Sequence, residues 1–269
     1  MKLSIFILFV ALAIFGYSYR DKLASYISTT KNIPTLAEPP KEDPRNELPP
    51  PPPKPALSYR LVTLVSENPG KELADIVGTQ YLPQVLSLNR IDDKHLRKDQ
   101  AIVIPSSFDD AFALSAFPKE LPELKEVPKM LLVSQRVQEF GAYEYGTLVR
   151  FGGVSTGKKS TPTPSKLYHT NWKGKLVTST VDDTWIMPWY FNLDNILGVS
   201  MHQYELPGYP ASHSCVRLSE ADAIWAYDWA LQWKLSLEDK VLQNGTPVLI
   251  FGDYAYGESA PWKKLPENP

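Results

Sequence analysis

Short apolar runs, separated by residues typical of turns, dominate the second half of the chain. The runs are rich in β-branched and aromatic residues, and runs of this length and composition predict strands. The predicted strands are residues 130–137, 143–151, 175–180, 196–202 and 247–251.

One helix is predicted between residues 219 and 237. Ser219 is followed three residues later by Asp222, an acidic variant of the capping box that begins helices. Strands that dominate, with one main helix packed on them, predict a mainly β fold for residues 127–252, either a β-sandwich or a curled sheet. Apolar residues at helical spacing are Ala223, Trp225, Ala226, Trp229, Ala230 and Trp233.

Residues 57–106 predict a separate small α+β unit. Residues 59–65 and 101–105 have the composition of strands, and residues 72–78 and 82–88 have helical apolar spacing between them. The predicted order is therefore strand, helix, helix, strand.

Residues 4–19 are almost wholly apolar and follow Lys2. As a helix they would span about 24 Å, a little less than a hydrocarbon core of about 30 Å. A signal peptide ends in small residues at its cleavage site, whereas this run ends in Tyr17, Ser18 and Tyr19 before Arg20. An uncleaved membrane anchor over residues 1–20 is favoured, with a cleaved signal peptide second and a buried core helix third. Both leading interpretations export the rest of the chain.

Two further segments predict no packed fold. Residues 31–56 hold ten prolines, which prevent a ladder of backbone hydrogen bonds and favour extended polyproline II. Residues 21–56 are therefore interpreted as a spacer rather than as a ligand for SH3-type domains, and residues 253–269 as a surface tail.

Charge and cysteine content narrow the class of protein. With 28 Lys and Arg against 30 Asp and Glu, the net charge is −2 and the isoelectric point about 6.1, which argues against a nucleic-acid-binding protein. The chain is 43% hydrophobic and 22% charged, so it is neither disordered throughout nor a protein of many membrane spans. Its one cysteine, Cys215, excludes an intrachain disulfide and a cysteine-rich zinc site.

The candidate chemistry surrounds Cys215. Two of the four histidines, His202 and His213, lie within 13 residues of it, and a turn through Pro207, Gly208 and Pro210 could return His202 to the cysteine. A thiolate is a nucleophile and an imidazole can serve as its base.

Two alternatives compete with the catalytic interpretation of these residues, and one further feature supports it. A lone cysteine is commonly a buried, inert small hydrophobe, although the polar neighbours of Cys215 make a poor apolar pocket. His202, His213 and Cys215 are all capable zinc ligands, but no acidic partner supports a metal site. The Ser219 cap follows Cys215 by four residues, so backbone N–H groups near a helix start could face a developing oxyanion.

At this point the residues resemble the catalytic domain of the L,D-transpeptidases (YkuD-type), which cross-link bacterial peptidoglycan. The resemblance runs from Val133 to Asp222 and includes residues 151–157, residues 160–165 and the Met187-Pro188-Trp189 segment. It ends in a histidine, His202, followed by Pro-Gly-x-Pro-Ala-Ser-His-x-Cys-Val-Arg-Leu over residues 207–218.

The resemblance implies a role for each motif residue. Cys215 is the acylated nucleophile, His202 takes its proton, and His213 lines the site. Arg217 holds the donor peptide or its loop, and Ser212 belongs to the same motif. Arg217 as a structural ion-pair partner and His213 as an ordinary loop histidine stay open.

The chain departs from the family pattern at two positions where glycine is usual, Ser165 and Ser214. Residue 214 could supply an oxyanion N–H, so Ser214 is expected to adopt a glycine-like backbone. A serine at positive φ costs roughly 1 kcal/mol or more.

Residues 57–106 resemble a degenerate LysM domain, a small peptidoglycan-binding module. The likeness rests on residues 86–105, with Asn89 ahead of Leu96 and Ile104-Pro105, and the usual Gly-Asp-Thr-Leu entry is not recognisable. A small structural domain without a ligand is the alternative.

The resemblances together imply an exported enzyme of the cell envelope. The thiolate would attack the third residue of a donor stem tetrapeptide, release D-Ala and pass the acyl group to an acceptor amine, without a cofactor. Stem peptides would be both donor and acceptor. The alternatives are a non-catalytic peptidoglycan-binding scaffold and a carboxypeptidase or amidase acting on the same substrate.

Overall fold

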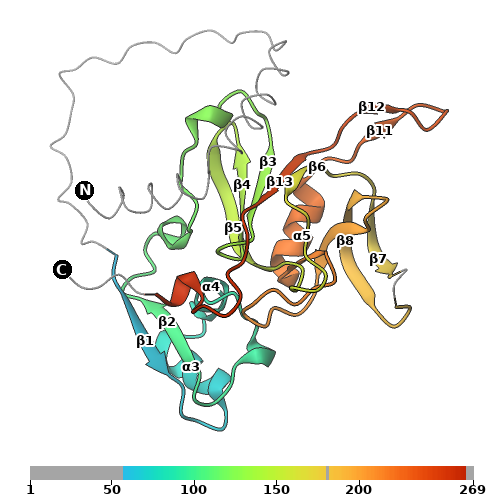
Figure 1. Cartoon of the computed structure of the whole chain (residues 1–269). Coiled ribbons are helices and arrows are strands. Elements are labelled where there is room, and N and C mark those ends of the chain that lie inside the picture. Colours follow the sequence, from blue (N-terminus) through green and yellow to red (C-terminus); the bar gives the residue numbers. More distant parts are fainter. Residues whose placement is uncertain (1–56, 180–181, 265–269) are drawn as a thin grey trace, which may run out of the picture.

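The computed structural model describes residues 57–179 and 182–264 (Figure 1). The predicted anchor, residues 1–20, and the proline-rich spacer, residues 21–56, lie outside the described residues. Within the described ranges, no helix is both long and apolar enough to cross a membrane.

Residues 57–106, called the small unit below, have the predicted order of elements. Strand β1 (Tyr59–Thr63) pairs antiparallel with β2 (Ala101–Pro105), and helices α3 (Pro69–Val77) and α4 (Leu82–Leu88) lie between them in sequence. A short 3₁₀ turn, η2 (Asp93–His95), follows α4. Their core contains Leu64, Leu73, Val85, Ile91, Leu96, Ile102 and Ile104.

The boundary of α3 has a local cause. The Asn68 side chain accepts a hydrogen bond from the Lys71 backbone N–H at 3.1 Å, and Pro69 follows as the first helical residue. Both features favour a helix start, so the helix begins earlier than the predicted residue 72. It ends before Gly78, whose φ of 86° is left-handed.

Residues 127–252, called the sheet domain, contain a nine-stranded sheet in the order β6-β13-β3-β4-β5-β10-β9-β8-β7. A separate two-stranded sheet joins β11 and β12, and 3₁₀ turns η3 (Ala111–Leu114), η4 (Pro122–Leu124) and η5 (Pro261–Lys263) lie outside both sheets. The strands are β3 (Met130–Ser134), β4 (Glu139–Glu144), β5 (Thr147–Ser155), β6 (Lys166–His169), β7 (Lys173–Thr178), β8 (Ile186–Asp194), β9 (Val199–Gln203), β10 (Val216–Leu218), β11 (Lys234–Leu235), β12 (Val241–Gln243) and β13 (Pro247–Phe251).

The sheet curls around helix α5 (Glu220–Trp229). Strands β3–β5 and strands β7–β8 lie on opposite sides of this helix (Figure 1). One core cluster accordingly joins Phe140 of β4 and Leu193 of β8 to Ala223 and Ala226 of α5. The predicted mainly β fold with one main helix is confirmed.

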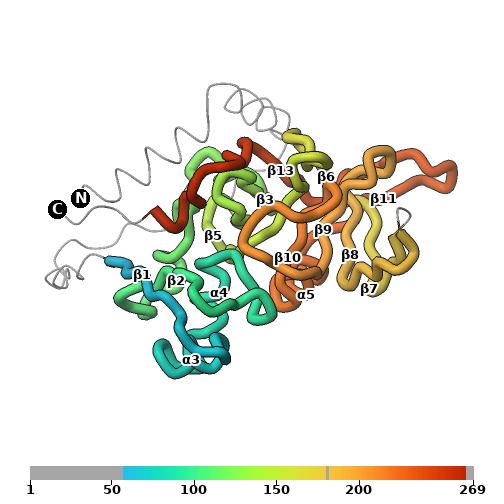
Figure 2. Tube along the Cα trace, turned by 60° about the horizontal axis from the view of Figure 1, so that its bottom comes forward, coloured from blue at the N-terminus to red at the C-terminus, as the bar shows by residue number. Residues whose placement is uncertain are grey.

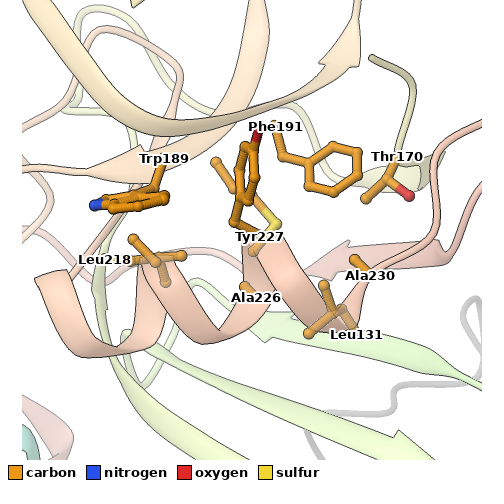
Figure 3. A pocket seen from close by; sticks show the side chains of 10 residues that line it. Leu131, Thr170, Trp189, Phe191, Leu218, Ala226, Tyr227 and Ala230 are labelled. Atoms are coloured by element: carbon orange, nitrogen blue, oxygen red, sulfur yellow. The ribbon is translucent and has the colours of Figure 1, made fainter. Parts of the chain in front are cut away.

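Alternate side chains of β3 pack into two different hydrophobic clusters, one on each face of the sheet. Leu131 and Val133 pack in the cluster that contains α5, whereas Met130 and Leu132 pack in a second cluster on the other face. Successive side chains of a strand point to opposite faces, so a strand buried on both sides is continuously apolar. A close view of the first cluster shows Trp189, Phe191 and Tyr227 around a small apolar pocket beside α5 (Figure 3).

Several predicted strands were wrong in extent. The strand predicted at residues 130–137 ends at Ser134, and the one predicted at residues 175–180 is β7, which covers Lys173–Thr178. Residues 143–151 are not one strand: they contain the end of β4, a turn at Tyr145 (φ 47°) and Gly146 (φ 84°), and the start of β5. Two consecutive left-handed residues are typical of a two-residue hairpin turn. The predicted strand 196–202 begins only at Val199, because the Asp194 carboxylate accepts hydrogen bonds from the backbone N–H groups of Ile196 and Leu197 and forms a turn.

The predicted helix 219–237 was too long. The Ser219 cap is confirmed, since its hydroxyl oxygen accepts from the Asp222 backbone N–H at 3.2 Å. The helix stops at Trp229 because Ala230 is extended and the next residue, Leu231, hydrogen-bonds to Thr170 and Thr246 instead. Trp233 therefore lies outside the helix.

Candidate active site

Parallel pairing of β9 and β10 assembles the candidate site. In this register Met201 lies opposite Val216 and His202 lies opposite Arg217. The chain leaves β9, passes through residues 204–215 and then pairs with β9 again as β10. Cys215, the residue before β10, therefore lies beside Ser200 of β9. The sequence predicted that His202 and the cysteine segment would meet, and the strand pairing brings them together.

The Cys215 sulfur has two hydrogen-bond partners, Ser200 on strand β9 and Gly198 just before that strand. Its Sγ lies 3.1 Å from Ser200 Oγ, and it donates to the Gly198 carbonyl at 3.6 Å. In the described part of the chain neither His202 nor His213 forms a hydrogen bond with it. Such contacts are often long in ligand-free enzymes and tighten when substrate binds.

His202 is buried and held in one tautomer. Its Nδ1 lies 3.0 Å from the Gln203 carbonyl oxygen, which can only accept, so Nδ1 carries the proton and Nε2 is left with the lone pair. Burial, together with the positive charge of Arg217, lowers the pKa of His202 to about 4. The imidazole is therefore neutral at neutral pH and can accept a proton.

The Cys215 thiol is also neutral in the resting site. Burial raises its pKa, and hydrogen bonds from Ser200 and the charge of Arg217 offset this only in part. Strand β10 (Val216–Leu218) separates Cys215 from the Ser219 cap in sequence, and the expectation that backbone N–H groups near this helix start face a developing oxyanion stays a prediction. Ionisation of the thiol in this site needs a base.

Arg217 supplies a positive charge next to both groups. Its guanidinium lies 4.5 Å from the centre of the Tyr204 ring, and burial lowers its pKa. It forms no salt bridge within residues 57–179 and 182–264, so the structure does not support the alternative of an ion-pair partner. The Glu205 carboxylate acts on this guanidinium through its charge, without a direct salt bridge.

Hydrogen bonds hold the backbone around the predicted residues Ser212 and Ser214, next to the cysteine. The buried Ser212 hydroxyl donates to the Cys215 carbonyl, and Thr163 Oγ1 donates to the Ser214 carbonyl at 2.9 Å. Ser214 has φ 78°, so the glycine-like backbone expected at this position is confirmed.

Residues of the two motif stretches, 151–157 and 160–165, bond to the same backbone and to each other. The Ser212 N–H donates to the Thr156 carbonyl at 3.0 Å, and the Gly157 N–H donates to Thr163 Oγ1 at 2.8 Å. A Cβ at Gly157 would lie 2.3 Å from the Thr161 carbonyl oxygen, so only glycine fits here. Ser165, the other departure from glycine, accepts from Gln135 Nε2 and donates to the Gly252 carbonyl.

His213 is the least integrated of the predicted residues. It is exposed, and its ring lies 6.3 Å from that of Trp185. Among the described residues it has no hydrogen bond to the Cys215 thiol, so the alternative of an ordinary loop histidine stays open.

Sequence reasoning missed a buried polar chain behind the cysteine. Ser200 is hydrogen-bonded to Tyr190, and Tyr190 Oη accepts from Asn192 Nδ2 at 3.0 Å. The Tyr190 ring also stacks near His202, with centroids 6.4 Å apart. The available signal was alternation, because Ser200 lies two residues before His202 and therefore on the same face of the strand.

No group of three or more His, Cys, Asp or Glu side chains that could hold a metal ion occurs among the described residues. The apolar pocket of Figure 3 contains neither Cys215 nor His202. The groups gathered at the candidate site are a thiol, an imidazole, hydroxyl groups and one guanidinium.

Residues 128–250 match the family model of YkuD, the L,D-transpeptidase catalytic domain. This match confirms the resemblance drawn from the motifs and coincides with the sheet domain. It does not extend to residues 57–106, so the LysM resemblance stays a prediction. A comparison with curated proteins gives no match.

Several solved structures to which this chain is similar are described as L,D-transpeptidases. One from Stackebrandtia nassauensis is 22% identical with a TM-score of 0.39, over 47% of this chain and 57% of that chain. One from Mycobacterium smegmatis is 18% identical with a TM-score of 0.38, over 46% and 59%. L,D-transpeptidase 3 from Mycobacterium tuberculosis, solved with a faropenem-derived adduct, is 21% identical with a TM-score of 0.36, over 46% and 60%. Each alignment spans less than two thirds of the other chain.

Proposed function

We propose that the sheet domain is a cysteine L,D-transpeptidase that cross-links peptidoglycan stem peptides. The observation that carries the proposal is the β9–β10 register, which aligns His202 with Arg217 and sets Cys215 beside Ser200 within a segment that matches the YkuD family. The same elements support a role for each residue.

Acylation begins with two neutral groups. When a donor tetrapeptide binds, the Cys215 proton passes to His202 Nε2 and the sulfur attacks the carbonyl carbon of the third residue. The C–N bond to the terminal D-Ala breaks, the proton from His202 goes to the departing amine, and a thioester remains on Cys215. Neutral reactants avoid burying an ion pair before the substrate arrives.

Transfer reverses these steps. An acceptor amine attacks the thioester carbonyl, His202 takes the amine proton, and the sulfur leaves and is reprotonated. A thioester is activated toward amines, which suits a cysteine for this reaction. Arg217 is suited to bind a donor carboxylate, since its guanidinium forms no direct salt bridge among the described residues and the Glu205 carboxylate acts on it only through its charge.

The position in the cell is part of the proposal. Residues 1–20 would export the chain and hold it in the membrane, and residues 21–56 would carry the domain toward the wall. Residues 57–106 would bind the same wall as a LysM-like module.

The test is a product analysis with a stem tetrapeptide and an excess of acceptor stem. The proposal predicts release of D-Ala and a cross-linked dimer, both lost in Cys215→Ala. D-Ala release without dimer would assign a carboxypeptidase. If a correctly folded chain formed neither D-Ala nor the dimer, the alternative of a non-catalytic scaffold would be supported instead.

A further inference from the structure

The small unit contacts the segment that joins His202 to Cys215. The Asp92 N–H donates to the Leu206 carbonyl at 2.9 Å, and the Leu206 N–H donates to Asp92 Oδ2 at 2.8 Å. Next to this pair, Ile91 and Pro207 form an antiparallel bridge. In Figure 2 the small unit, blue to teal, lies beside the orange segment that leads into β10.

The Asp92 carboxylate is itself fixed within the small unit. Its Oδ1 accepts from the His95 backbone N–H at 3.1 Å and lies 2.6 Å from His95 Nδ1. His95 Nε2 in turn lies 3.9 Å from a carboxylate oxygen of Glu205. One oxygen of Asp92 therefore bonds its own unit while the other bonds the catalytic segment, so the side chain has little freedom to turn away.

The small unit is anchored to the sheet independently of this segment. The buried Arg90 guanidinium pairs with Glu139 of β4, and its Nε donates to the Val137 carbonyl at 2.9 Å. The Gly153 N–H of β5 donates to Ser87 Oγ at 3.2 Å. Asp92 thus holds the segment from a support that is fixed to β4 and β5.

The far side of the segment is held by the sheet itself. Ser155 of β5 donates to the Tyr209 carbonyl at 2.7 Å and accepts from the Ala211 N–H at 3.0 Å. Residues 204–211 are therefore hydrogen-bonded to the small unit at Leu206 and to β5 at Tyr209 and Ala211. His202 lies just before this segment in the chain, and Cys215 lies four residues after it.

We propose that Asp92 is a positioning residue, through which the small unit fixes the segment that sets His202 relative to Cys215. The inference rests on the proposed function only in that acylation of Cys215 is the activity it affects. The small unit is then part of the catalytic apparatus, in addition to any binding of the wall. Displacements of about 1 Å between reacting groups can cost up to a hundredfold in rate.

The test uses the full chain and two readouts. The first is the rate of adduct formation on Cys215 with faropenem, followed by intact mass. The second is hydrogen exchange of the Leu206 amide, which needs no activity. Asp92→Ala removes both acceptor oxygens and is expected to slow acylation by about tenfold or more and to speed Leu206 exchange by about tenfold. Asp92→Asn, which keeps one acceptor oxygen, should fall between this variant and the native chain.

The matched control is Ile104→Val, which trims a buried side chain of the small unit away from the segment. It should lower the unfolding midpoint but leave both the acylation rate and Leu206 exchange at native values. Unchanged Leu206 exchange in Asp92→Ala, native acylation in that variant, or an equal loss of acylation in Ile104→Val would each overturn the proposal. If the native chain forms no adduct, the proposed function fails, whereas Leu206 exchange still decides whether Asp92 holds the segment.

Discussion

Arg90 of the small unit and Glu139 of strand β4 form an ion pair that is buried on both sides, with side-chain exposures of 3% and 2%. Glu139 also accepts hydrogen bonds from the Ser115 hydroxyl at 2.6 Å and the Ala116 N–H at 2.9 Å. Every oxygen of the carboxylate is therefore satisfied at the junction of the small unit and the sheet domain. The two parts of the chain are joined through a polar core, not only through apolar contact.

Removing one partner of this pair should be costly. Glu139→Ala leaves the Arg90 guanidinium buried without a counter-charge, and such losses are typically about 3–5 kcal/mol. Urea unfolding of Glu139→Ala should show this loss. The control is Glu238→Ala, which removes an exposed ion pair with Lys240 and should change stability by less than about 1 kcal/mol. Equal effects of the two substitutions would refute the structural role of the pair.

The low pKa of His202 predicts that the acylation rate falls only at a more acidic pH than in an enzyme with an ordinary histidine base. Because burial lowers this pKa to about 4, the imidazole stays a competent base from pH 7 down to about 5. Acylation should therefore persist through the range where an ordinary histidine, of pKa about 6.5, protonates. A rate profile from pH 4 to 8 tests this, and a midpoint near 6.5 would contradict it. His202→Ala should lower the rate by about a hundredfold.

The same shift links stability to pH. The folded-state pKa lies below the unfolded value of about 6.5, so the unfolded chain binds more protons between pH 6.5 and 4. The free energy of unfolding should therefore decrease as the pH is lowered from 6.5 to 4, with His202 contributing about 3 kcal/mol of this loss. His202→Gln should flatten this part of the stability curve measured by urea unfolding. A curve of native steepness in this variant would assign the pH dependence to other groups.

The Ser200–Tyr190 chain should tune the thiol. Removing the Ser200 hydroxyl takes away a hydrogen bond that lowers the pKa of Cys215, so Ser200→Ala should shift the iodoacetamide alkylation profile to higher pH. Tyr190→Phe should shift it less, and should add nothing in the Ser200→Ala background. Tyr168→Phe, which removes a hydroxyl bonded to the Pro164 carbonyl, is the control. Additive shifts would show that Tyr190 acts independently of Ser200.

Ser214 carries backbone strain that glycine would relieve. Its φ of 78° disfavours any residue with a Cβ, so Ser214→Gly should raise the free energy of unfolding by about 1 kcal/mol. Ser160→Gly, at an exposed position outside the positive-φ residues, should stabilise nothing. A loss of stability in Ser214→Gly would show that the serine side chain contributes more than its backbone costs.

Much of the architecture could be predicted from local patterns. The strand at residues 247–251 and the helix at residues 82–88 were found with their observed limits, because each combines a clear apolar pattern with nearby turn signals. The three-residue strand β10 was missed since it is too short to show a pattern. The turn at Tyr145 and Gly146 was hidden within a run of strand-forming residues.

The candidate site likewise has a part that the sequence could predict and a part that it could not. Cys215, His202, Ser212 and Ser214 could be found because they lie in one continuous motif. The contacts of Arg90 and Asp92 with the sheet domain join residues that are 49 and 114 positions apart. No local periodicity reports such a pairing, so the docking of the small unit could only come from the structure.

The most direct measurement of the central claim is the intact mass of the full chain after incubation with faropenem. A β-lactam that acylates a cysteine transpeptidase should add one covalent adduct to the native chain. Peptide mapping should place it on Cys215, and Cys215→Ala should keep its unmodified mass. A native chain that folds correctly but gains no mass, or an adduct that persists in Cys215→Ala, would contradict the assignment of Cys215 as the nucleophile.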